Sequence, residues 1–133
     1  MIVAAWNIEK CGLSSSLEKQ AALDTFLYEC AYADGDDTPY ADLIFLCEVH
    51  SARVDNFVEF LTDVYGHHYY IDAVDGNYSN NYVYMIRQDC YQNDWIVPIS
   101  TWRNERPMLT IQCALSSGTP MWGCSTRNQG KLV

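Results

Sequence analysis

Two polar side chains stand near the ends of two of the most apolar stretches of this sequence. Asn7 interrupts the apolar run at 2–8, and Glu48 comes late in the run at 42–49, within "DLIFLCEVH". Each run is apolar at consecutive positions, which predicts a strand buried on both faces, in the middle of a sheet rather than at its edge. An amide oxygen beside a carboxylate suits Mg²⁺, with water and a substrate phosphate completing the octahedral shell. These residues therefore favour cation-assisted chemistry at a phosphate group.

A helix predicted between the two strands would bring Asn7 and Glu48 together. "SSLE" at 15–18 has the form of a capping box, and apolar residues near helical spacing follow to about Ala33. A strand–helix–strand crossover makes the two strands parallel, and parallel strands share a carboxyl end. Open α/β sheets bind ligands in the crevice at that end. The alternatives are that Asn7 caps a turn and that Glu48 only reaches solvent.

The rest of the chain predicts a second helix and four further strands. The helix has one apolar face from Val54 to Val64 or Tyr65, and Gly66 ends it. The fold class predicted is α/β, a βαβ opening followed by an antiparallel meander. The domain would span 1–115, and 116–133 would form an irregular tail. The further strands are expected at 67–74, 81–87, 94–100 and 107–115, with the turn-rich "DGNYSNN" joining the first two as a hairpin.

Length and charge limit the function further. A chain of 133 residues, 49% of them hydrophobic, fits one compact domain. The net charge of −9 argues against unaided binding to a phosphate backbone, but a bound divalent cation reverses the sign locally. No basic segment with a cleavage site precedes the first strand, and no apolar run has the length of a membrane span. These features predict a cytoplasmic protein without a membrane span.

Three other groups of residues bear on metal or redox chemistry. The six cysteines form no CxxC pair, so buried free thiols are expected at Cys30 and Cys47, with disulfides only in an oxidising compartment. His67 and His68 are a second metal candidate, although neighbouring strand residues point to opposite faces. The acidic "DGDDTP" at 34–39 lacks the full calcium-loop pattern and is expected to be a solvated turn.

Four stretches together resemble a known family. "WNIEKCG" and "DLIFLCEV" resemble the first two motifs of the endonuclease/exonuclease/phosphatase superfamily, the DNase I-like metal-dependent phosphoesterases. "NYVYMIR" and "WRNERPMLTIQC" are similar to the strands that follow, the second with an arginine at its entry. The resemblance covers about residues 2–113 in consistent order. It implies a sandwich of two sheets packed face to face, of which this chain resembles the first half.

The resemblance implies a role for three residues. Asn7 would orient a phosphate or a metal-bound water, or contribute to the metal site, and Glu48 would ligate Mg²⁺ or Mn²⁺. Arg106 would hold a phosphate oxygen with its planar guanidinium; the alternative is a surface arginine before a strand. The substrate would be a phosphoester, with nucleic acid among the candidates.

The sequence also departs from the family pattern. Cys47 replaces a glutamine, which removes a hydrogen bond that would orient Glu48. Asn80 stands where nuclease members hold a glutamate. The family's later histidine, its G-D-x-N motif and its terminal Asp-His pair have no counterpart, although they supply the acid/base groups that activate water. We therefore expect a Mg²⁺-dependent phosphoesterase-like or nuclease-like domain whose catalytic site is incomplete in this chain.

Two other functional classes remain open. The chain could be a non-catalytic protein-binding module, a pseudoenzyme or inhibitor that retains the first sheet of the fold, or a fragment without a function of its own. A single sheet would leave one apolar face uncovered, which predicts a homodimer or a protein partner over that face. The irregular end after Leu115 fits either a truncated or altered reading frame or a genuine short paralogue.

Overall fold

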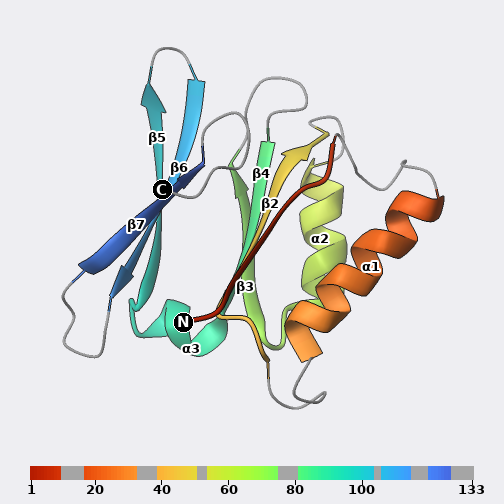
Figure 1. The fold of residues 1–133 in the computed structure, drawn as a ribbon, viewed down its shortest axis with the longest axis horizontal. Helices are drawn as coiled ribbons and strands as arrows, with labels where there is room; N and C mark the ends of the chain where they lie inside the picture. Colours follow the sequence, from red (N-terminus) through yellow and green to blue (C-terminus); the bar gives the residue numbers. More distant parts are fainter. Residues whose placement is uncertain are drawn as a thin grey trace.

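The computed structural model describes residues 1–9, 17–32, 39–50, 54–74, 81–103, 106–114 and 120–126. Within them it is an α/β structure of three layers, with two helices on one face of a four-stranded sheet and a three-stranded sheet on the other (Figure 1). The predicted α/β class is therefore confirmed.

The four-stranded sheet has the strand order β1-β2-β4-β3. β1 and β2 are parallel, whereas β4 is antiparallel to both β2 and β3. Helix α1 separates β1 from β2 in the chain, so the predicted βαβ opening is confirmed. The bounds are β1 Val3–Asn7, α1 Leu17–Tyr32, β2 Leu43–Val49, β3 Tyr69–Val74 and β4 Asn81–Arg87.

Strand β1 lies at the side of this sheet, so its predicted place in the middle is wrong. Its predicted burial on both faces is wrong as well: Val3, Ala4 and Trp6 are half-buried and Ala5 is exposed. Ala4 and Trp6 pack against the cluster under the helices, and Val3 packs against the cluster between the sheets, so the cover on each face of β1 is partial.

Helix α2, Val54–Tyr65, packs its predicted apolar face on the sheet. Phe57 and Leu61 are buried there with Leu27 of α1. Gly66 ends the helix as predicted, and a Cβ built there would lie 2.3 Å from the Thr62 carbonyl oxygen. Only glycine fits this close approach of the backbone.

None of the described helices is both long enough and apolar enough to cross a bilayer.

The predicted meander divides into two sheets. After β4 the short helix α3, Gln88–Gln92, leads the chain into β5, Ile96–Arg103, and from there into β6, Arg106–Ala114, and β7, Pro120–Thr126. These last three strands form an antiparallel sheet of their own. The expected irregular tail is therefore wrong for residues 120–126.

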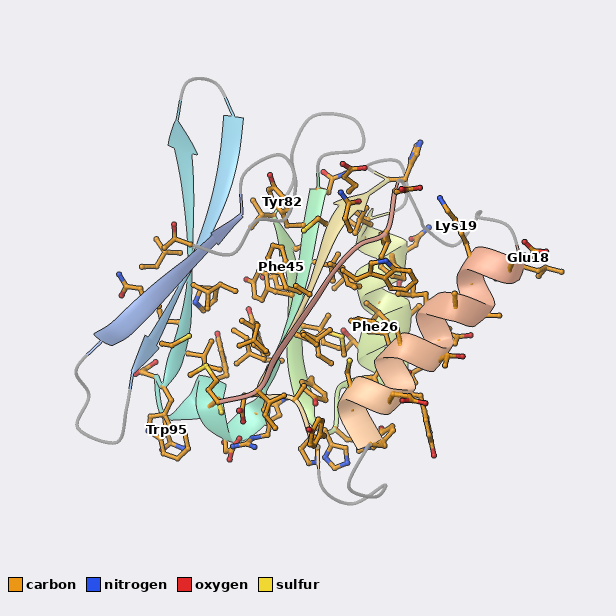
Figure 2. The ribbon with its side chains drawn as sticks, in the orientation of Figure 1. Glu18, Lys19, Phe26, Phe45, Tyr82 and Trp95 are labelled. Atoms are coloured by element: carbon orange, nitrogen blue, oxygen red, sulfur yellow. The ribbon has the colours of Figure 1, made fainter. Side chains whose placement is uncertain are left out.

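The second sheet covers the face of the first sheet that was expected to be exposed. Phe45 and Tyr82 point toward it, with ring centroids 5.9 Å apart (Figure 2). They are buried in one cluster with Ile96 and Ile111 of the second sheet. The expected uncovered face is therefore wrong, and with it the reason for placing a homodimer or partner on it.

Candidate functional site

The structure brings Asn7 and Glu48 together at the carboxyl end of the sheet, which is the end at which β1 and β2 finish. Asn7 Nδ2 donates a hydrogen bond of 3.0 Å to Glu48 Oε1. The backbone N–H of Ile8 donates to the Cys47 carbonyl at 3.1 Å and continues the parallel pairing past the end of β1. Because the two strands are parallel and adjacent, the predicted meeting of their polar ends is confirmed.

A β-bulge turns Glu48 out of the protein core. Ile44 and Leu46 belong to the cluster under the helices, so simple alternation would place Glu48 on that side as well. Instead Val49 takes that position, and the pairing with β4 shifts between Leu46 and Val49. Glu48 has a φ of 57°, in the left-handed region, and is the one half-buried residue of an otherwise buried strand. The extra residue redirects its carboxylate to the end of the sheet.

Asn81 holds this bulge in place. It is fully buried, and its Nδ2 donates a 2.7 Å hydrogen bond to the carbonyl of Val49, the residue at which the pairing with β4 resumes. Asn81 is not among the site residues predicted from the sequence. The sequence feature that could have identified it is an asparagine at the first position of an apolar strand, because asparagine is unusual at a buried position.

Two hydrogen bonds fix the orientation of the Asn7 amide. Its Oδ1 accepts from the backbone N–H of Glu9 at 3.0 Å, while its Nδ2 donates to Glu48. The opposite orientation would place oxygen against the carboxylate and NH₂ against an N–H, so both partners select the same one. Asn7 thus presents its NH₂ group to Glu48, a geometry that suits an orienting residue better than a cation ligand beside it.

Cys47 takes no part in orienting Glu48. It is 1% exposed and lies in the cluster between the sheets. Burial, together with the negative charge of Glu48, raises the pKa of its thiol to about 12, so the thiol stays protonated. The described side chain that orients Glu48 is Asn7, whose Nδ2 donates to Oε1. Among the cysteines whose side chains the structure describes, Cys30, Cys47, Cys90 and Cys113 are free thiols. Cys47 is buried as expected, whereas Cys30 is only half-buried.

The structure does not test the phosphate-binding role predicted for Arg106. This residue begins β6 and is paired in register with Arg103, but its side chain is outside the part of the chain that the structure describes. Asn80, residues 34–38 of the acidic turn and the serines of the capping box are also outside that part. The arginine that ends "NYVYMIR", Arg87, lies at the other end of the sheet, because β4 runs antiparallel to β2.

His67 and His68 lie in a turn after α2 and not in the predicted strand. Their ring centroids are 4.1 Å apart, and the Tyr32 hydroxyl lies 3.4 Å from His67 Nε2. Within the described ranges no group of three or more His, Cys, Asp or Glu side chains is arranged to hold a metal ion. Glu48 is the ligand predicted at the carboxyl end of the sheet, and a Mg²⁺ ion bound through one carboxylate would keep most of its water.

Comparison with known proteins finds no relative of this chain. No protein-family model matches the chain, and no curated protein or solved structure matches it significantly. The resemblance to the DNase I-like phosphoesterases stays a prediction from the motifs in the sequence.

Proposed function

We propose that this chain is a Mg²⁺- or Mn²⁺-dependent phosphoesterase-like or nuclease-like domain, in which Glu48 is the protein ligand of the cation and Asn7 orients its carboxylate. The observation that supports this proposal is the strained bulge that aims Glu48 at Asn7 at the carboxyl end of two parallel strands. When bound, the cation would offset the charge of a substrate phosphate and polarise its ester bond.

Glu9 and Asp94 also have positive φ, so it is the combination of backbone strain with a side-chain hydrogen bond from Asn7 that favours this proposal over a purely structural role for Glu48. A non-glycine residue at positive φ costs about 1–3 kcal/mol, and glycine or asparagine adopts the same conformation more cheaply. A turn-capping or solvating role does not need a carboxylate at this position. A carboxylate that is both strained in its backbone and directed by a neighbouring amide favours a role in binding.

In this proposal the two oxygens of the Glu48 carboxylate have different partners. Asn7 engages one carboxylate oxygen, Oε1, and within the described residues Oε2 is the oxygen that would meet a cation. A protein of net charge −9 attracts divalent cations but repels phosphate esters. We therefore expect phosphate to bind only after the cation, with Arg106 as the predicted second contact.

The test is a titration of Mn²⁺ into the folded protein, followed by NMR and calorimetry. We expect Mn²⁺ to broaden the backbone amide signals near Asn7 and Glu48, and Glu48→Gln to abolish this while the rest of the spectrum is kept. Asp72→Asn, which removes the same charge from an exposed position on β3, is the matched control and should leave the broadening intact. Equal broadening in wild type and Glu48→Gln would refute the role of Glu48. Absence of binding by the folded wild type would favour the non-catalytic, protein-binding alternative.

A further inference from the structure

A second surface feature lies on the helix layer and involves none of the residues of the carboxyl-end site. Helices α1 and α2 lie side by side over the sheet (Figure 1). Between them is an open groove of about 500 Å³, here called the helix groove. Its lining consists of Asp24, Thr25, Tyr28 and Glu29 of α1 with Phe60, Val64 and Tyr65 of α2.

The middle of the helix groove exposes large apolar side chains. Tyr28 is 55% exposed, and Phe60 and Val64 are 42% exposed each. Phe60 and Val64 are four residues apart on α2, so they form one stripe along that helix. A cluster of this kind on an outer layer marks an interaction surface more often than isolated exposed residues do.

The rim of the helix groove is acidic. The two helices carry six exposed carboxylates and a single described cation, Lys19, which Figure 2 places near the start of α1 together with Glu18. Asp24 and Glu29 line the groove itself. The carboxylates are Glu18, Asp24, Glu29, Asp55, Glu59 and Asp63.

The charge and the secondary structure together select the kind of partner. A second copy of the chain would set acidic helices against each other, and a nucleic acid or an anionic membrane would be repelled. An extended peptide would find no backbone partners, because helices satisfy their own backbone groups. A helix brings its own hydrogen bonds and can lay an apolar stripe into a groove between two others.

We propose that the helix groove binds a cationic amphipathic helix of a partner protein, with apolar residues on Tyr28, Phe60 and Val64 and with Lys or Arg facing Asp24 and Glu29. The lining covers residues 24–29 of α1 and 60–65 of α2, which at 1.5 Å per residue is about 8 Å along each helix, so the groove contacts about one and a half turns of such a helix. This inference is independent of the function proposed for Glu48.

The test uses a Leu/Lys peptide of about 12 residues whose leucines recur at helical spacing, with a peptide of scrambled order as its control. Binding is measured by fluorescence anisotropy at low and high salt. We expect Phe60→Gln to weaken binding about tenfold or more, since it removes an apolar contact from an exposed site without disturbing the core. Asp24→Asn with Glu29→Gln should weaken binding about tenfold at low salt and much less at high salt.

The matched control is Asp72→Asn with Asp94→Asn, which removes the same charge from exposed positions outside the helix layer and should change the affinity less than about twofold. Equal binding of the scrambled peptide, or equal weakening by this control pair, would mean that net charge alone attracts the peptide and would overturn the proposal. A dimer of the free protein that Phe60→Gln converts to monomer would overturn it in favour of a second copy.

Discussion

The two ends of the four-stranded sheet place a carboxylate in different surroundings. At the carboxyl end, Glu48 has a neutral partner, Asn7, and a strained backbone. At the other end, Asp42 accepts from Arg87 at 2.8 Å and from the backbone N–H of Ile2 at 2.6 Å. Arg87 also reaches Asp89 at 2.6 Å. The protein itself thus supplies the counter-charge for Asp42, whereas within the described residues no ion pair serves Glu48.

This difference separates a carboxylate that holds the fold from one that is available to a ligand. The Arg87 ion pairs join the start of β2, the end of β4 and α3, so they fix three elements at once. The hydrogen bond from Asn7 fixes a direction without removing the charge. Substitutions at the two ends should therefore have different consequences for stability and for binding.

The largest effect on stability is expected at the Arg87 end. Arg87→Met would leave the carboxylate of Asp42, whose side chain is 14% exposed, without its cation. We expect a loss of about 2–3 kcal/mol in the free energy of unfolding, measured by urea denaturation, because the remaining charge is poorly solvated. Asp42→Asn should restore part of the loss in the double variant, since it removes that charge. A loss below about 0.5 kcal/mol would show that this pair behaves like an exposed one.

The next effect concerns the residue that holds the bulge. Asn81→Ala would leave the buried carbonyl of Val49 without the side-chain donor of Asn81 and open a small cavity. We expect a loss of about 2 kcal/mol in the free energy of unfolding, together with weaker Mn²⁺ binding, because Glu48 is no longer aimed. Calorimetry at a temperature where the variant is folded separates the two effects. Unchanged Mn²⁺ affinity there would show that the bulge does not depend on Asn81.

A smaller effect of opposite sign is expected at Glu48 itself. Glu48→Gly relieves the backbone at φ 57° and should raise the free energy of unfolding by about 1 kcal/mol while abolishing cation binding. Glu48→Ala loses the carboxylate without that relief and should not be stabilised. If thermal unfolding shows the two variants to be equally stable, the strain assigned to Glu48 is absent.

The smallest effect is the pH dependence of Asp89. Burial alone would raise the pKa of this carboxyl, but the hydrogen bond and charge of Arg87 hold it below its ordinary value. A lowered folded-state pKa gives stability that is present above the unfolded value, near 4, and is lost as pH falls through the folded value. Because the Asp89 side chain is 53% exposed, we expect less than about 1 kcal/mol. An NMR titration that gives the same pKa for Asp89 in wild type and Arg87→Gln would contradict this cause.

The sequence predicted the meeting of Asn7 and Glu48 because it depends on chain topology alone. Two apolar strands with a helix between them become parallel, and their ends then coincide. It did not predict the bulge, because "LIFLC" is apolar at every position and its alternation between faces is unreadable. The pattern also missed β7, where Pro120 and Gly123 interrupt a stretch with neither strand nor helix period. Arg106 could be predicted as a phosphate-binding residue only from the resemblance to the DNase I-like phosphoesterases.

The pairing of β1 with β2 has a consequence for the order in which the chain folds. Val3 pairs with Leu43, so this contact closes a loop of 40 residues, whereas Arg103 pairs with Arg106 three residues away. Closing a long loop costs more chain entropy than extending a hairpin, so we expect protection from pulsed hydrogen exchange to reach β5 and β6 before β1. The candidate site requires β1, β2 and β4 in register. It would therefore form among the last parts of the protein, and a partly folded chain would have no cation site.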